Sequence, residues 1–307
     1  MRVRPSTFSI AARDPDTETA GVAVQSKFVA VGAVVPFVAS DAGAVATQSY
    51  ANVAYGPDGL DLLRDGHDAE AVVERLTSED EERASRQVGI VGADGSVAAF
   101  TGEECLDYAG DVQGENYTVQ GNILENRETL EAMAETFEES EGGLPERLIA
   151  ALHAGNEAGG DSRGEQSAAL YVAREGGGYD GKNDRWIDVR VDDSPKPIDE
   201  LERVFKIYDV TLLAREPPEE TRSLEGDRAE AVTAVLADLG HYEGSSTEFG
   251  EDEREALEGF RGVNNFENHD LDVLEDAIAR GWDDADGEGE ELLVDAIWQG
   301  LSRLERK

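Results

Sequence analysis

Polar side chains, most of them amides and hydroxyls, gather at four places where apolar runs of the chain end. A buried amide or hydroxyl needs a hydrogen-bond partner, and it can also bind a substrate or stabilise a developing negative charge. A single cluster is typical of side chains that cap strands and bond to one another, but four clusters favour a shared pocket. The clusters are Gln25-Ser26, Thr47-Gln48-Ser49-Tyr50 with Asn52, Gln120-Gly121-Asn122, and the loop of Asp161, Arg163, Gln166 and Ser167.

The nucleophiles and bases in the sequence limit which catalytic mechanisms are available. The four histidines are scattered without the spacing of metal ligands, so we expect neither a histidine-based triad nor a zinc site. The remaining option is a hydroxyl activated by another base, such as a threonine whose own N-terminal amine accepts its proton. An α-amine has a pKa of about 7.7 to 8.0, so it can do this near physiological pH. The segment Ser6-Thr7-Phe8-Ser9 offers such hydroxyls.

The apolar runs between the clusters predict the elements that hold them. Strands are expected from Thr7 to about Val53, including the run Val29 to Val38, and a hairpin starts at Arg86. Helical spacing appears from Leu60 to Leu76, with Asp68 as an N-cap, and again in two later helices. The later elements are helices at 127–138 and 145–154 and strands near 168–174 and 186–191. Because regular βαβ alternation is absent, this order predicts sheets with helices on their outer faces.

The composition changes after Ala214. The segment Arg215-Glu216-Pro217-Pro218-Glu219-Glu220 reads as a linker, and everything beyond it has the leucine and alanine spacing of helices. We therefore expect a first domain at 1–213, a linker at 214–227 and a small all-α domain at 228–307. The helices of that domain are expected at 224–240, 251–262, 270–281 and 289–304.

The net charge of the chain is extreme. Lys and Arg number 27 against 68 Asp and Glu, which gives a formal net charge of −41, and 22 of the 27 basic residues are arginines. Such a charge repels phosphate backbones and anionic lipids, so we expect neither a nucleic acid nor a membrane as partner. The dispersed carboxylates and the few lysines resemble cytosolic proteins of halophiles that accumulate salt.

This charge predicts that the fold depends on salt. The Debye length falls to about 3 Å at 1 M salt, so the repulsion among carboxylates is screened there and acts fully in dilute buffer. We expect the melting temperature to be higher in molar KCl than in dilute buffer, where structure is lost. A thermal unfolding series in KCl measures this, and an unchanged melting temperature would contradict it.

Cysteine content and the N-terminal sequence suggest where the protein works. The single Cys105 excludes an internal disulfide and is expected to be a small buried hydrophobe. The N-terminus has charge but no apolar signal region, and no stretch approaches about 18 apolar residues. We therefore expect a cytoplasmic protein without a metal or other cofactor. Homo-oligomer formation stays open.

Several motifs occur in order over roughly residues 7–213. They are Thr7 to Asp14, Gly21 to Ser26, Gly43 to Asn52, Arg86-Gln87-Val88-Gly89, Val119 to Asn122, and GGDSRGEQSAAL at 159–170. Together they resemble the family catalogued as domain of unknown function 1028, which is grouped with the Ntn (N-terminal nucleophile) hydrolases. The resemblance implies an α+β fold, the four-layer αββα sandwich of that superfamily.

The resemblance also implies a role for particular residues. Thr7 is the expected catalytic nucleophile, with its freed amine as the base. The residues expected to orient the amine or to bind an oxyanion or substrate are Gln25, Ser26, Thr47, Gln48, Asn52, Asn122, Asp161 and Arg163. The implied activity is hydrolysis of a small amide or related C–N bond in a small-molecule substrate.

The residues before Thr7 leave a second function open. The family pattern begins at the threonine after the initiator Met, whereas here MRVRPS comes before Thr7. Without cleavage at that point, Thr7 has no free amine beside its hydroxyl. The alternative is a non-catalytic protein that binds a small molecule in the same polar pocket.

The C-terminal part carries a separate resemblance. Residues 232–244 and 249–260, within roughly 228–281, are similar to a small helical peptidoglycan-binding module. In a cytoplasmic protein we expect this module to serve in packing or recognition.

Overall fold

The computed structural model describes residues 7–307 and divides the chain into two compact units, Met1–Glu202 and Arg203–Lys307. The MRVRPS segment lies outside the described residues. Within the described part, no helix has the length and apolar character needed to cross a membrane.

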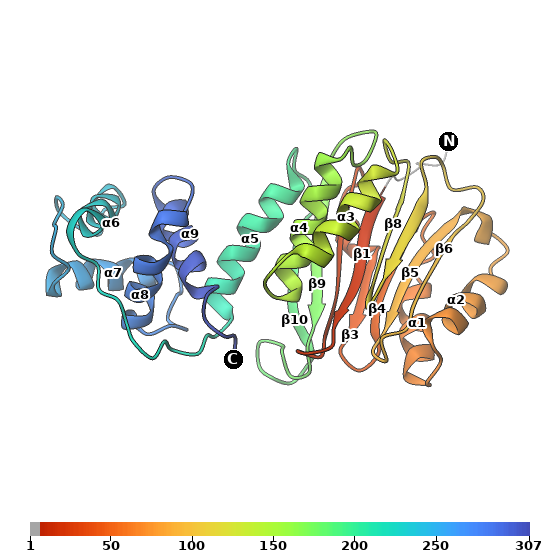
Figure 1. Cartoon of the computed structure of the whole chain (residues 1–307), viewed down its shortest axis with the longest axis horizontal. Helices are drawn as coiled ribbons and strands as arrows, with labels where there is room; N and C mark the ends of the chain where they lie inside the picture. The colour runs from red at the N-terminus through yellow and green to blue at the C-terminus, as the bar shows by residue number, and fades with distance from the viewer. Residues whose placement is uncertain (1–6) are drawn as a thin grey trace. The chain divides into compact units, whose positions relative to one another are not determined.

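The first unit contains two antiparallel sheets. In the six-stranded sheet the order is β10-β9-β2-β1-β8-β7, and in the four-stranded sheet it is β3-β4-β5-β6 (Figure 1). The strands of the larger sheet are β1 Thr7–Asp14, β2 Thr19–Ser26, β7 Gly110–Gly114, β8 Tyr117–Asn122, β9 Ser167–Ala173 and β10 Arg185–Val191. Those of the smaller sheet are β3 Pro36–Ala39, β4 Gly43–Ser49, β5 Arg86–Gly92 and β6 Val97–Thr101.

Helices cover the outer face of each sheet. Helices α1 (Tyr55–Arg64) and α2 (Ala69–Ser78) pack on the four-stranded sheet, while α3 (Glu128–Glu139) and α4 (Leu144–Glu157) pack on the six-stranded sheet (Figure 1). The expected N-cap is present, because the Asp68 carboxylate accepts a hydrogen bond from the Ala71 backbone N–H. The expected α+β class and the four-layer αββα arrangement are confirmed.

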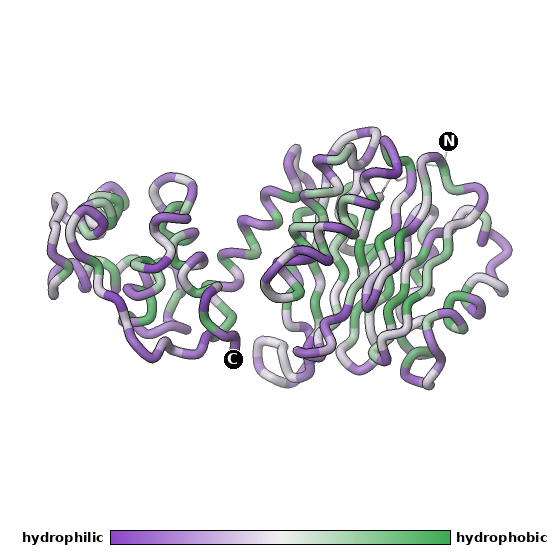
Figure 2. The backbone as a smooth tube through the Cα atoms, viewed as in Figure 1, coloured by the Kyte–Doolittle hydropathy of each residue, from purple (hydrophilic) through white to green (hydrophobic). Residues whose placement is uncertain are grey.

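Small apolar residues fill the space between the two sheets. Val22 and Val24 of β2 pack there against Ala44 and Ala46 of β4 and against Val91. Because side chains alternate along a strand, the neighbouring positions face the helices instead. In Figure 2, green segments gather along the strands of the two sheets, and purple is frequent in the connecting loops.

The prediction of a strand from Val29 to Val38 is wrong for most of its length. Residues Val31–Ala33 form a 3₁₀ turn, and β3 begins only at Pro36. Ala30 has a φ of 54°, in the left-handed region, which lies outside the range of regular strand geometry. Valine-rich composition therefore reflects burial in this segment rather than strand geometry.

The second unit is helical, as expected. Its helices are α6 Gly226–Asp238, α7 Glu251–Val263, α8 Leu271–Gly281 and α9 Glu290–Leu301. Leu236, Leu257, Phe260, Leu274 and Leu293 form the centre of its core. Helix α5 (Pro197–Leu212), which the sequence analysis missed, runs across the boundary of the two units.

Candidate functional site

One end of the space between the sheets is polar rather than apolar. Strand β1 presents Thr7 and Ser9 there, and β8 presents Gln120 and Asn122, which pair with Ser9 and Thr7 in the antiparallel register. Each of these four side chains is at most 2% exposed. The four-stranded sheet adds two more buried amides, described next, so the six side chains form one buried polar cluster.

Gln48 connects the two sheets. Its Oε1 accepts a 2.6 Å hydrogen bond from the Ser9 hydroxyl, and its Nε2 donates to Gln87 Oε1 at 2.8 Å and to the Gln120 carbonyl at 3.2 Å. The same Nε2 lies 3.4 Å from the Thr7 carbonyl oxygen. The backbone of Thr7 is therefore held from the opposite sheet.

Gln87 of β5 is the second connection. Its Nε2 donates to the carbonyls of Gly121, at 2.8 Å, and Gly110, at 3.1 Å, while its Oε1 also accepts from Asn122 Nδ2 at 3.0 Å. A buried network whose members are all bonded is rigid, because any movement breaks several hydrogen bonds at once. The network thus forms a fixed floor beneath Thr7.

The Thr7 hydroxyl lies at the edge of this floor. Its Oγ1 is 3.1 Å from the Ser26 hydroxyl, on the neighbouring strand β2. Thr7 also lines a cavity of about 240 Å³, together with residues of the segment 28–35 and of the β4 end. A hydroxyl pair beside a cavity is an arrangement that can attack or bind a small molecule.

The segment 27–31 forms one wall of this cavity and is held by the loop before β9. Ser167 Oγ donates to the Phe28 carbonyl and accepts from the Val31 N–H at 3.1 Å. Asp161 Oδ2 accepts from the Lys27 N–H at 2.8 Å. The polar residues of this loop therefore fix a wall of the cavity from behind.

Asp161 and Arg163 contact each other rather than lining the cavity. Their side chains form an ion pair at 3.3 Å, and the Asp161 carboxylate also accepts from the Arg163 N–H at 2.9 Å. The Asp161 side chain is fully buried, and that of Arg163 is 32% exposed. The structure therefore places this pair in support of Lys27.

We expect Asp161→Ala to lower the free energy of unfolding by about 3 kcal/mol, because it removes a fully buried carboxylate and leaves the Lys27 N–H and the Arg163 guanidinium without this acceptor. Denaturant unfolding in molar KCl measures the change. Asp180→Ala is the matched control, since that carboxylate is half exposed and pairs with Lys182; it should change stability by less than about 0.5 kcal/mol. Equal effects of the two substitutions would contradict the supporting role of Asp161.

Arg86 contributes the charge at the cavity. Its guanidinium donates to Asp80 at 2.9 Å, to Glu82 at 2.8 Å and to the Tyr50 carbonyl at 2.5 Å. Burial disfavours the charged form of Asp80, but the hydrogen bonds from Arg86 and neighbouring donors outweigh it and hold the pKa of its carboxyl well below the usual range. Arg86 is therefore a fixed, neutralised cation.

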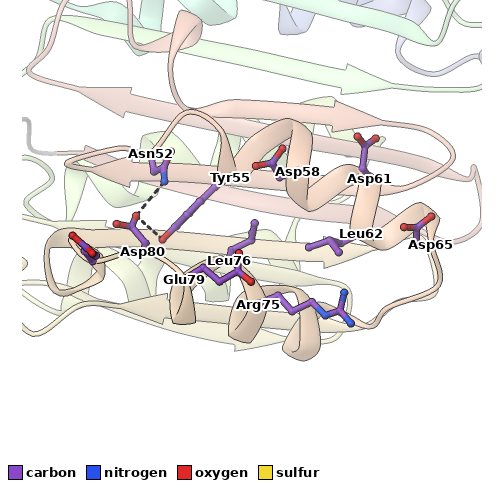
Figure 3. Close-up of a pocket in the computed structure, with 11 residues that line it drawn as sticks. Asn52, Tyr55, Asp58, Asp61, Leu62, Asp65, Arg75, Leu76, Glu79 and Asp80 are labelled. Carbon is purple, nitrogen blue, oxygen red and sulfur yellow. Dashed lines mark hydrogen bonds between the residues drawn. The ribbon is translucent and has the colours of Figure 1, made fainter.

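Asn52 lies on the other side of Asp80. Its Nδ2 and the Tyr55 hydroxyl both donate to Asp80 Oδ2, at 3.1 Å and 2.9 Å (Figure 3). Burial and the bond to Asp80 raise the pKa of Tyr55 well above its usual value. The Asn52 side chain is thus connected to the Thr7 cavity through Asp80 and Arg86.

Asn52 and Asp80 belong to a larger cavity of about 580 Å³ between α1 and α2 (Figure 3). Carboxylates predominate among the residues that line it, and the sequence of this chain makes such clusters frequent. Among residues 7–307, no group of three or more His, Cys, Asp or Glu side chains could hold a metal ion. We place the candidate site at the smaller cavity because Thr7 and Gln48 line it.

Two of the expected residues face away from Thr7. Gln25 is next to Ser26 in β2, so alternation turns its side chain to the helix-covered face of the sheet. Its amide is fully buried and makes no hydrogen bond within the described residues. Thr47 alternates with Gln48 in the same way, and its hydroxyl donates to the Asn52 carbonyl at 3.2 Å.

The structure brings Ser26, Gln48 and Asn122 of the expected set together with Thr7. It adds Ser9, Gln87 and Arg86, which the sequence analysis did not assign to the pocket, and Gln120, which it placed in a polar cluster but not among the expected site residues. Their signal was present, because each is a polar residue in a strand that also carries buried apolar residues. The signal was incomplete, since polarity alone does not say which face of the sheet a residue occupies.

Two glycine motifs in the sequence match known patterns without their structural context. Residues 160–164 fit Gly-x-Ser-x-Gly, but Ser162 lies in an exposed loop between a helix and a strand, and its hydroxyl donates to the Ile123 carbonyl at 3.0 Å. Residues 176–181 fit Gly-x-Gly-x-x-Gly, but they connect antiparallel strands β9 and β10 rather than a strand and a helix. Neither motif forms the site that its pattern usually marks.

Comparisons with known proteins agree with this architecture. Residues 7–201 match the model "Family of unknown function (DUF1028)", and residues 211–298 match the model "Putative peptidoglycan binding domain". The crystal structure of a DUF1028 protein from Silicibacter pomeroyi is similar at 34% sequence identity and a TM-score of 0.61, over 66% of this chain and 89% of that chain. The comparison with curated proteins gives no match. With the family model covering most of the chain and this similarity to a solved member, the chain belongs to the DUF1028 family.

Proposed function

We propose that the protein is an Ntn-type hydrolase of a small amide or related C–N bond, with Thr7 as nucleophile. The observation that carries the proposal is the position of Thr7, whose hydroxyl lies 3.1 Å from Ser26 and beside a cavity. The four-layer sandwich and the fixed amide floor beneath Thr7 support it. The proposal requires cleavage before Thr7, in the part of the chain outside the described residues.

The reaction follows from the groups at Thr7. The freed α-amine takes the proton from Thr7 Oγ1, which attacks the substrate carbonyl carbon and forms a C–O bond. The C–N bond then breaks, and the leaving amine takes the proton from the Thr7 ammonium. Water, deprotonated by the same amine, hydrolyses the resulting ester and restores the hydroxyl.

The neighbours of Thr7 supply candidate partners for these steps. The Ser26 hydroxyl is close enough to donate to an oxyanion formed next to Thr7 Oγ1. Asn122 lies opposite Thr7 in the register, where its amide can orient the freed amine. Gln48 holds the Thr7 carbonyl and so fixes the direction of the strand end.

A β-lactone tests this proposal without knowledge of the substrate. Its strained ring transfers its acyl group to an activated hydroxyl and loses no atoms, so the protein gains the full mass of the lactone. We expect one label, on the Thr7 hydroxyl of a peptide that begins at Thr7, and none on a Thr7→Ala protein. A label elsewhere, or none on protein that begins at Thr7, would overturn the proposal and favour the non-catalytic binding protein.

A further inference from the structure

The cavity beside Thr7 has an unusual lining for so acidic a chain. Phe28, Val31, Val34, Val35 and Ala51 supply apolar surface, and among the side chains of the described residues that line it Arg86 alone carries a charge. Apolar side chains that face a cavity gain free energy when an apolar group displaces water from them. The lining therefore favours an apolar group in the ligand.

The state of Arg86 argues against a charged group there. Its guanidinium already bonds to two carboxylates, Asp80 and Glu82, so the local net charge is negative and a ligand carboxylate is repelled. A ligand ammonium finds no carboxylate among the described lining residues. A charged ligand group of either sign would lose its hydration on entering the cavity without gaining a partner of opposite charge, which is costly.

The cavity also limits the size of the group. Its volume is about 240 Å³, whereas an engineered cavity of about 150 Å³ already holds benzene. Scaling from benzene gives room for roughly nine non-hydrogen atoms. A compact side chain fits, but a sugar chain or a peptide of several residues does not.

We propose that this cavity binds a compact, uncharged, apolar group of an amide substrate, of the size of a branched five-carbon chain or a phenyl ring. The amide carbon then lies at the polar edge, within reach of the Thr7 and Ser26 hydroxyls. This assignment deepens the proposed function by naming the substrate class, and it rests on that function for the meaning of the amide. Binding itself does not require turnover.

The test is an NMR titration of the full chain, labelled at valine methyl groups, in molar KCl. The probe is 4-methylpentanamide, and the Thr7→Ala protein is used so that no probe is consumed. Its charged analogues are 4-methylpentanoate and 3-methylbutylamine. For a fragment of this size we expect a Kd of about 1 mM for the amide, shifts at the methyls of Val31, Val34 and Val35, and binding of both analogues weaker by about 10-fold or more.

A cavity-filling substitution locates the binding. Val34 is half-buried at the cavity, so Val34→Phe should fill part of the space and weaken amide binding by about 10-fold. Val263→Phe is the matched control, because Val263 is 70% exposed on α7, and it should leave the Kd unchanged. The comparison is valid if the spectrum of the remaining valine methyl groups shows that the Val34→Phe protein is folded. If that protein does not fold, Val35→Leu is used in its place.

The outcomes separate this assignment from the proposed function. Amide binding that Val34→Phe weakens supports the cavity, and it does so even when β-lactone labelling of Thr7 fails. Equal binding of a charged analogue, no binding of the amide, or binding insensitive to Val34→Phe overturns the assignment. In each of those cases a labelled Thr7 would leave the hydrolase proposal standing with a different substrate.

Discussion

Thr7→Ala should reduce turnover by about 10⁴-fold or more, the scale seen when a covalent nucleophile is removed from an enzyme. The substitution takes away Oγ1 and its 3.1 Å contact with Ser26, but it leaves the strand pairing and the buried amide floor intact. We therefore expect the free energy of unfolding to fall by only about 1 kcal/mol. Steady-state kinetics on an amide found by screening, together with denaturant unfolding in high salt, measure both quantities.

Thr7→Ser is the control for this prediction. It keeps a hydroxyl at the same atom position, so activity should stay within about 10-fold of the wild type. A Thr7→Ala protein as active as Thr7→Ser would show that the hydroxyl does not form the covalent intermediate. The pocket would then be a binding site without a threonine nucleophile.

Gln87→Leu should be the most destabilising single change in the polar network, at about 3 to 5 kcal/mol of unfolding free energy. The substitution removes the acceptor of Gln48 and Asn122 and the donor to the Gly110 and Gly121 carbonyls. These groups are buried between two sheets, so water cannot replace the lost partner. Chemical unfolding in molar KCl gives the value directly.

Gln113→Leu is the matched control. Gln113 lies on edge strand β7, exposed, with its amide on Asp111 at 2.9 Å. Because solvent satisfies both groups after the change, we expect a loss within about 0.5 kcal/mol. If Gln87→Leu costs no more than this control, the network is not the rigid floor on which the position of Thr7 depends.

Much of the fold could be predicted from the sequence because local patterns and global structure agree. Phe8, Ile10 and Ala12 alternate along β1, and Asp68 caps α2, so period and capping chemistry give the right elements. In the segment 29–35, the local pattern and the global structure disagree. Val31 and Val35 are buried, but Ala30 is left-handed, Val29 is exposed, and contacts from distant Ser167 shape the turn.

Only part of the candidate site could be predicted from the sequence, and the reason for the missing part is physical. Gln25 and Ser26 are adjacent and equally polar, yet a period of two sends them to opposite faces of the sheet. In the sequence, Gln87 appears only as part of the motif Arg86-Gln87-Val88-Gly89. Its contribution to the site becomes visible in the structure, where β5 lies opposite β8 and Gln87 donates to the Gly121 carbonyl. Asp161 is expected from the sequence to orient the amine or to bind an oxyanion or substrate, whereas in the structure its carboxylate accepts from the Lys27 N–H and so supports a wall of the cavity.

The most direct test of the central claim, that Thr7 is an N-terminal nucleophile, is the intact mass of the protein purified from its native host in high salt. The account predicts a mass that lacks residues 1–6, so that the amine of Thr7 is free beside its hydroxyl. A mass that retains Arg2 to Ser6 would contradict it and make small-molecule binding the better function for this cavity.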